Sequence, residues 1–261
     1  MKKRPNIIQI TTHDSGRHFG CYGHPTLHTP AIDNFASEGV MLTNYFATAP
    51  ICCASRATQL TGLYPQTHGL MDLCFSPFNW RINDEVKHLS QILRDAGYNT
   101  FLFGIQHEVA GEELHRLNFK VVWEIKGKNC IQIADDVMGF LKNSASAEMP
   151  FYLQIGFFET HTPFSYGGAK PDYEHGVEIP PYMADDELSR NEMAAFQGSI
   201  RMVDTAIEKI LFALHKSGME DNTIVVFTTD HGIEMPRAKW FLYDPGIAIG
   251  FIIRYPEGGV G

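Results

Sequence analysis

The chain has 261 residues, a hydrophobic content of 44% and a formal charge of −9 at pH 7. This length allows one large α/β domain or two small ones, and the hydrophobic content is that of a globular protein. The acidic balance argues against nucleic acid as a partner, because a phosphate backbone binds to a basic surface. An anionic small substrate is still compatible with this charge, since a bound metal ion reverses the local field.

Five cysteines, scattered except for the pair Cys52-Cys53, lack the pattern of a disulfide framework, so we expect reduced thiols. The basic start at residues 1–5 precedes an apolar run of residues 7–10, which is too short for a signal peptide. No stretch approaches the ~20 apolar residues that span a bilayer. These patterns predict a cytoplasmic protein with no membrane partner, or a periplasmic one if a leader has been removed.

Strands alternate with helices along the chain, which predicts a mostly parallel sheet with helices on both faces. The predicted strands cover residues 6–11, 40–47, 100–104, 120–125, 151–158, 223–228 and 247–255. The predicted helices cover residues 29–39, 86–96, 131–141 and 186–218, and a further helix follows Ser55 as its cap. Two irregular segments, residues 66–80 and 165–185, are typical of functional loops, and we expect the first to face a substrate. No repeat or break in composition divides the chain, so we expect one domain.

Polar side chains of the types that bind metals and move protons follow several predicted strands. They are His13 and Asp14, His107, His161, and Asp230 with His231, while the loop that contains Cys52 follows another strand. Because the carboxyl ends of parallel strands meet at one edge of a sheet, we expect these side chains to share a site. Each motif alone has a simpler interpretation, since an aspartate before Ser-Gly often forms a turn and a single histidine often lies in a solvated loop.

The stretch at residues 49–62 places a cysteine and an arginine at the predicted start of a helix. The helix dipole and the Arg56 guanidinium both favour an anion there, either a Cys52 thiolate or a bound oxyanion. The alternative is that Cys52 and Cys53 are small buried hydrophobic residues.

This stretch resembles the modification motif of the sulfatase family, Cys-x-(Pro or Ala)-x-Arg followed by Leu-Thr-Gly, on Cys52, Ala54, Arg56 and Leu60-Thr61-Gly62. The resemblance extends over almost the whole chain. Further matching segments are Arg4-Pro5-Asn6-Ile7-Ile8, Asp14, Cys21-Tyr22-Gly23, Thr29-Pro30-Ala31-Ile32-Asp33, His107, His161-Thr162-Pro163, Asp230-His231-Gly232 and Lys239. The motifs around His13 and His107 are most similar to those of bacterial sequences related to heparan N-sulfatase.

The resemblance implies an alkaline-phosphatase-like sulfatase core, with residues 1–261 forming the N-terminal catalytic domain. Family members normally continue into more sheet and a smaller C-terminal subdomain, so we expect a truncated product whose activity is impaired. The resemblance also implies that Cys52 is oxidised to formylglycine, by a formylglycine-generating or an anaerobic sulfatase-maturating enzyme. The implied substrate is a sulfated small molecule or glycan, from which inorganic sulfate is released by hydrolysis of a sulfuric ester or a sulfamate.

The site roles carried over from the family form one mechanism. A divalent cation, Ca²⁺ by family custom, is held by His13, Asp14, Cys52, Asp230 and His231, and it polarises the sulfur for attack by a formylglycine hydroxyl. The implied catalytic residues are Cys52, Arg56, His107, His161 and Lys239. Arg56, Lys239 and His161 stabilise charge and protonate the leaving group, and His107 removes the proton that lets sulfate depart.

Two positions depart from the family pattern. His13 stands where the family has an aspartate, and a nitrogen ligand favours Mn²⁺ or another transition metal over Ca²⁺. Ile105 replaces a lysine of the sulfate pocket. Two alternative functions therefore stay open, a phosphatase or phosphonate monoester hydrolase on the same fold, and an inactive glycan-binding remnant.

Overall fold

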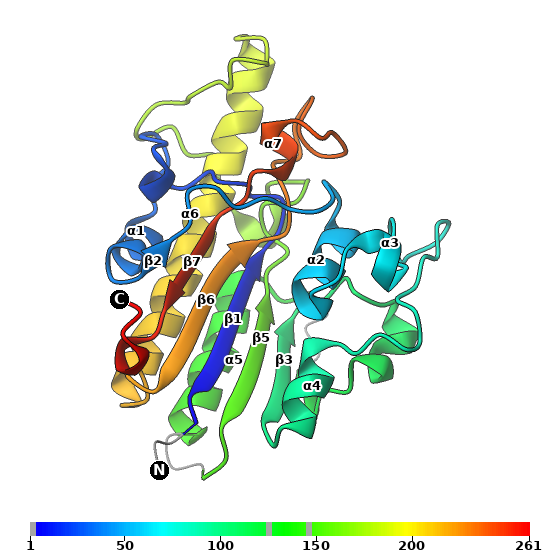
Figure 1. The fold of residues 1–261 in the computed structure, drawn as a ribbon. Coiled ribbons are helices and arrows are strands. Elements are labelled where there is room, and N and C mark those ends of the chain that lie inside the picture. The colour runs from blue at the N-terminus through cyan, green and yellow to red at the C-terminus, as the bar shows by residue number, and fades with distance from the viewer. Residues whose placement is uncertain (1–3, 124–126, 145–147) are drawn as a thin grey trace.

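The computed structural model describes residues 4–123, 127–144 and 148–261. Within these ranges the central sheet has seven strands, which are β1 (Asn6–Thr12), β2 (Val40–Met41), β3 (Asn99–Gly104), β4 (Val121–Trp123), β5 (Phe151–Gly156), β6 (Thr223–Thr229) and β7 (Phe251–Arg254). Their order is β2-β7-β6-β1-β5-β3-β4 (Figure 1). The strands from β6 to β4 run parallel, and β7 and β2 pair antiparallel at one edge.

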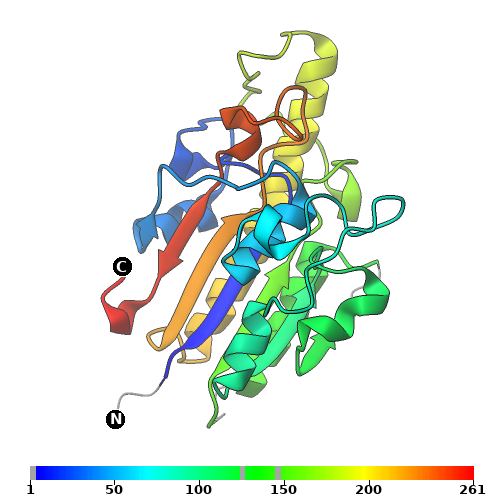
Figure 2. The ribbon, with the colours of Figure 1, turned by 45° about the vertical axis from the view of Figure 1, so that its right-hand side comes forward.

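The helices of the described residues lie on both faces of this sheet. They are α1 (Pro30–Ser37), α2 (Cys52–Thr61), α3 (Pro65–His68), α4 (Leu89–Asp95), α5 (Cys130–Ser144), α6 (Glu187–Lys216) and α7 (Asp244–Ile247), with short 3₁₀ turns at Gly20–Tyr22, Gly111–Leu117, Tyr166–Gly168 and Pro256–Gly258. One face is covered by α1, α5 and α6, and α2 and α4 lie on the other (Figures 1 and 2). The predicted class, a mostly parallel α/β sheet between helices, is confirmed.

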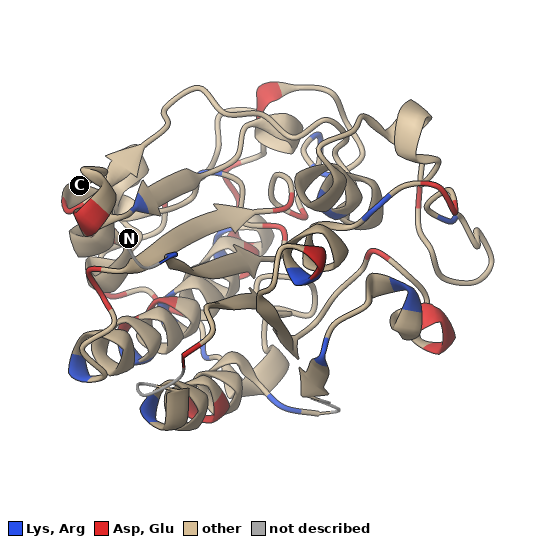
Figure 3. Cartoon of the chain, turned by 60° about the horizontal axis from the view of Figure 1, so that its bottom comes forward, with Lys and Arg blue, Asp and Glu red and all other residues tan. Residues whose placement is uncertain are grey.

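Burial on both faces explains why the central strands are apolar throughout. All six residues of β5 are buried, and α5 packs on α6, with Val137, Leu141, Val203 and Ile207 buried in the core that they share. The strands in Figure 3 are almost free of charged residues, which lie on the helices and loops. The apolar core therefore fixes the sheet, and the polar residues collect where its strands end.

Several predicted boundaries are wrong for identifiable reasons. Only Val40 and Met41 of the strand predicted at residues 40–47 pair with β7, because this short strand is the edge of the sheet. The strand predicted at 247–255 begins at Phe251, since Pro245 starts the short helix α7 before it. The helix predicted at 86–96 starts at Leu89, where the His88 side chain accepts a hydrogen bond from the Ser90 amide.

Two predictions fall on residues outside the described ranges. They concern the first residues of the basic start at 1–5 and the end of the strand predicted at 120–125, of which β4 is described. Among the residues that the structure describes, no helix combines the length and the apolar character needed to cross a bilayer.

Candidate active site

The ends of β1 and β6 place four donor side chains side by side. The two strands are paired in register up to Thr12 and Thr229, so His13-Asp14 and Asp230-His231 follow at the same edge. Asp14 adopts a left-handed backbone with φ of 43°, and its amide donates a hydrogen bond to Asp230 Oδ1 at 2.9 Å. Aspartate tolerates this conformation better than most residues do, and strained positions of this kind occur at functional sites.

These four residues form a fully buried cluster whose donor atoms lie within 4.8 Å of one another. His13 Nδ1 is 2.6 Å and His231 Nε2 is 2.8 Å from Asp14 Oδ1. His231 Nε2 nevertheless makes no hydrogen bond of acceptable geometry, which leaves a buried polar atom without a partner. The two carboxylates and two imidazoles are a donor set that fits a divalent cation.

The pKa shifts of the cluster residues also fit a bound cation. Although burial alone raises it, the pKa of Asp14 is held well below its ordinary value by His13 and His231. Asp230 is shifted in the same direction, because the opposing effect of burial on its pKa is outweighed by His13, His231 and Arg56. Both carboxylates are therefore ionised at neutral pH and attract positive charge. They raise the pKa of His231 well above its ordinary value against the effect of burial.

Helix α2 begins directly at Cys52, four residues earlier than a Ser55 cap predicts. Its N-cap is Ile51, which provides no side-chain hydrogen bond, so the prediction of Ser55 as cap is wrong. Ser55 lies inside the helix and donates from Oγ to the carbonyl of Asp230. This contact attaches the first turn of α2 to the end of β6, which a sequence pattern cannot indicate.

Arg56 binds the same strand end from the next position of the helix. Its Nε donates to Asp230 Oδ2 at 2.9 Å, and one Nη donates to the carbonyl of Thr12 at 3.1 Å. A hydrogen bond with Cys53 and burial together raise the pKa of the Cys52 thiol well above its ordinary value, which favours a buried thiol over a thiolate at this position. All five cysteines are free thiols, and Cys52 is 4% exposed.

Lys239 reaches the cluster from the loop after β6. Its Nζ donates to Asp14 Oδ2 at 2.7 Å and lies 3.3 Å from His161 Nε2. Burial lowers the pKa of Lys239, but Asp14 and Glu234 raise it further, so the amine stays charged. His161, which follows β5, contacts the cluster through Lys239 and also directly, with its ring centroid 4.7 Å from that of His13.

Glu234 was missed by the sequence analysis. One of its oxygens lies 3.3 Å from Lys239 Nζ, and the other lies 3.3 Å from His161 Nδ1 and accepts from the Thr162 hydroxyl at 2.8 Å. Its position two residues after Gly232 in the predicted site loop was the only available signal. Glu234 holds both the lysine and the histidine in place.

His107 closes the cluster on the β3 side. Gly104, with φ of 86°, ends this strand so close to β5 that a Cβ there would lie 1.9 Å from the Gly156 carbonyl. This turn brings His107 Nδ1 to 3.2 Å from His13 Nε2. Although part of His107 is exposed, burial of most of its ring lowers its pKa well below the ordinary value.

The next residue, Glu108, is a second carboxylate that the sequence analysis missed. Its side chain is fully buried, and one oxygen has no hydrogen-bond partner. Burial raises its pKa to about 7, against the lowering effect of Arg56. A carboxylate beside a predicted site histidine was the signal for it.

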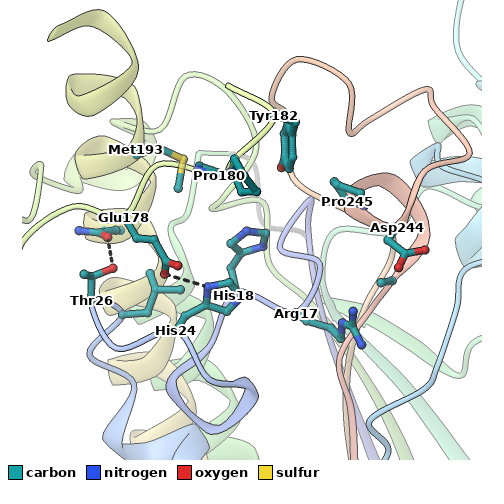
Figure 4. A pocket seen from close by; sticks show the side chains of 14 residues that line it. Arg17, His18, His24, Thr26, Glu178, Pro180, Tyr182, Met193, Asp244 and Pro245 are labelled. Carbon is teal, nitrogen blue, oxygen red and sulfur yellow. Dashed lines mark hydrogen bonds and ion pairs between the residues drawn. The ribbon is translucent and has the colours of Figure 1, made fainter. Parts of the chain in front are cut away.

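The structure thus brings together all nine predicted site residues, which are His13, Asp14, Cys52, Arg56, His107, His161, Asp230, His231 and Lys239. A separate pocket with a cavity volume of about 200 Å³ opens on the other side of the loop after Asp14, between residues 17–27, 178–182 and 244–248 (Figure 4). Figure 4 shows Glu178 paired there with His24, at 3.4 Å. In the described chain, none of the nine residues lines this pocket.

The sequence profile of the sulfatase family matches residues 5–260, which includes every residue of the cluster. The chain belongs to the sulfatase family. It is 25% identical to an ulvan-active sulfatase of Formosa agariphila, over 98% of this chain and 48% of that protein. It is 27% identical to the N-sulphoglucosamine sulphohydrolase of Homo sapiens, over 98% of this chain and 56% of that enzyme. The chain therefore spans about half the length of these curated relatives.

Solved structures of the family have the same fold. A Bacteroides fragilis protein described as a sulfatase superposes with a TM-score of 0.84 at 22% identity, over 98% of this chain and 69% of that chain. The phosphonate monoester hydrolase of Agrobacterium radiobacter superposes with a TM-score of 0.72 at 20% identity, over 97% of this chain and 68% of that chain. These likenesses confirm the alkaline-phosphatase-like sulfatase fold.

Proposed function

We propose that the protein hydrolyses a sulfuric ester or sulfamate of a glycan sugar and releases inorganic sulfate. The observation that carries this proposal is the position of Cys52. It starts α2 beside two buried carboxylates, Asp14 and Asp230, and among the cations Arg56 and Lys239. Such a site combines a place for a nucleophile with positive charge for an oxyanion.

The buried cluster of His13, Asp14, Asp230 and His231 would hold one divalent cation, with residue 52 beside it. A cation bound there would polarise an oxygen of the sulfate group. The two nitrogen donors make Mn²⁺ a candidate beside Ca²⁺, because Ca²⁺ prefers oxygen donors. Conversion of Cys52 to formylglycine by a maturation enzyme would supply, as the aldehyde hydrate, a hydroxyl nucleophile and a second hydroxyl.

The remaining residues act through their own charges and protons. Arg56 and Lys239 stabilise the negative charge that builds up on the sulfate oxygens. His161 Nε2, beside the Lys239 amine, is placed to protonate the departing oxygen or nitrogen. The ring is oriented from Nδ1, which lies 2.7 Å from the Thr162 carbonyl and 3.3 Å from the Glu234 carboxylate. His107, neutral because of its lowered pKa, is placed to accept a proton near residue 52.

A second pocket gives the proposed sugar a place beside these histidines. It has a cavity volume of about 430 Å³ and is lined by Ile105, Trp123, Phe158 and Tyr166 among others. The ring of Phe158 stacks on His161 with centroids 4.9 Å apart. Apolar and aromatic walls of this kind bind ligand rings. Ile105 adds apolar surface to this wall at the position where the family pattern has a charged lysine. The relatives' names, ulvan-active sulfatase and N-sulphoglucosamine sulphohydrolase, support a sulfated sugar as substrate.

The test uses protein made with a maturation enzyme. An intact mass of the peptide that contains Cys52 shows whether H₂S has been lost and O gained. Sulfate and phosphate release are then measured from a pair of aryl esters that share one aryl leaving group and differ only in the transferred group, sulfate or phosphate. We expect conversion and faster sulfate release, with loss of activity in Cys52→Ala and retention in Cys53→Ala. Faster phosphate release, as the fold likeness to a phosphonate monoester hydrolase allows, would overturn the proposal. Converted protein that releases neither anion from the aryl esters, and no sulfate from any sulfated sugar, would also overturn it.

A further inference from the structure

His13 faces two groups of donors at once. Its Nδ1 lies 2.6 Å from Asp14 Oδ1, and its Nε2 lies 3.2 Å from His107 Nδ1. Asp14 therefore lies behind His13, at the ring nitrogen opposite to the one that faces His107. A carboxylate behind a histidine in this way is the arrangement that prepares imidazole to bind a metal ion.

A third donor, Cys52 Sγ, completes this second group. The sulfur and one nitrogen each of His13 and His107 lie within 4.8 Å of one another. In tetrahedral zinc sites the Zn–N distance is about 2.0–2.1 Å, which sets neighbouring nitrogens about 3.4 Å apart. The observed 3.2 Å between His13 Nε2 and His107 Nδ1 matches that spacing.

We propose that, before Cys52 is converted, Cys52 Sγ, His13 Nε2 and His107 Nδ1 form a binding site for a thiophilic divalent ion such as Zn²⁺. One sulfur and two imidazole nitrogens are a zinc-type ligand set, and the fourth position is open. This site differs from the carboxylate-rich one, because it uses the opposite nitrogen of His13. It does not depend on the proposed hydrolysis, since it belongs to the unconverted chain.

Binding of the ion releases one proton, and side chains around the site compensate its charge. Zn²⁺ binds the thiolate, so the Cys52 thiol releases its proton to solvent as the Zn–S bond forms. The thiolate and the carboxylates of Asp14 and Asp230 supply negative charge. This charge offsets the positive charge of the ion and of the nearby Arg56 and Lys239 side chains. His107 is partly exposed, which gives the ion a route from solvent.

The same sulfur is the atom that a maturation enzyme must reach. An ion held by His13, His107 and Cys52 therefore blocks the Cys52 sulfur from the maturation enzyme until the ion is removed. The neighbouring Cys53 thiol is not one of the three donor groups, and its Sγ lies 3.6 Å from Cys74 Sγ.

The experiment uses unconverted protein, made in a host without a maturation enzyme and kept reduced with a phosphine. Co²⁺ is titrated as the probe, because cobalt bound to thiolate gives a charge-transfer band in the near ultraviolet. We expect the band to saturate at one equivalent of Co²⁺ and to disappear when Zn²⁺ is added. Cys52→Ser should lack the band, while Cys53→Ser and Cys74→Ser keep it. His107→Gln should weaken Co²⁺ binding by at least about tenfold, the smallest cost usual for a supporting partner of a metal site.

Circular dichroism establishes that each variant is folded. A band that persists in folded Cys52→Ser, or the lack of a band in the unsubstituted protein, would overturn the proposal, and so would unchanged affinity in folded His107→Gln. The result is separable from the proposed function. Sulfate release is measured on converted protein, so its failure leaves the cobalt band of unconverted protein unaffected.

Discussion

Arg56 Nε donates to Asp230 Oδ2 at 2.9 Å, and both side chains are almost completely buried. This pair joins the first turns of α2 to the end of β6, so it fixes residue 52 relative to the carboxylate cluster. A buried charge that loses its partner costs far more than an exposed one. The pair therefore has a structural effect that can be measured apart from any activity.

Arg56→Ala is expected to lower the free energy of unfolding by about 3–5 kcal/mol, because it leaves Asp230 buried beside fewer positive charges. Urea unfolding followed by circular dichroism measures this difference. Arg190→Ala is the matched control, since Arg190 pairs with Asp185 on the surface, where a salt bridge contributes about 0–1 kcal/mol. Equal losses in the two variants would contradict the assignment.

Glu234→Gln is expected to reduce kcat for sulfate release by about 10–100-fold, the usual cost of losing a supporting carboxylate. Lys239 and His161 would keep their places less well, while the sugar contacts and KM change little. Glu178→Gln is the control, since it removes another Glu–His pair, with His24, outside the cluster. A change confined to KM, or the same loss in the control, would argue against a positioning role for Glu234.

Glu108 makes stability depend on pH. Burial raises its pKa from an ordinary 4.5 to about 7, so the unfolded chain loses this proton at lower pH than the folded chain does. Between about pH 4.5 and 7 the unfolded state binds fewer protons, and the free energy of unfolding falls as pH rises, then levels off above 7. The difference corresponds to at most about 3 kcal/mol.

Glu108→Gln should therefore flatten this decline, as measured by urea unfolding at several pH values across the range. Part of the decline remains in the variant, because burial also raises the pKa of Asp204 to about 6. Asp204→Asn serves as the comparison, since it should flatten only the lower part of the range. Parallel curves for Glu108→Gln and the unsubstituted protein would show that the glutamate is ionised in the folded state throughout.

Metal preference should depend on residue 13. In converted protein, Mn²⁺ is expected to raise Tm more than Ca²⁺ does at equal concentration, because His13 offers nitrogen. At 100 times Kd the bound ion adds about 2.7 kcal/mol, which raises Tm by about 5–11 °C for a chain of this size. His13→Asp should reverse the order, and His24→Asp, outside the cluster, should not. A larger effect of Ca²⁺ on the unsubstituted protein would be inconsistent with a nitrogen ligand from His13.

The central strands could be predicted because they carry their own signal. β5 and β6 are continuous apolar runs bounded by polar residues, and the residues after them were identified as site candidates for that reason. Strands at the edge of the sheet carry a weaker sequence signal. β2 pairs over two residues only, and its length depends on where β7 lies rather than on local propensity.

The sequence by itself determined the alternation of strands and helices. Because strand ends of a parallel sheet converge, it also predicted that the Cys52 loop would meet His13, Asp14, His107, His161, Asp230 and His231 at one edge. The resemblance of its motifs to the sulfatase family added Arg56 and Lys239. The tertiary structure alone decided how they face one another. Folding buried Cys52, which raises the pKa of its thiol, and turned Ser55 from a cap into a link to Asp230. It also brought Glu234 to Lys239 and buried Glu108 where it interacts with the charge of Arg56. These outcomes depend on burial and on distances between segments far apart in the chain, which residue order does not contain.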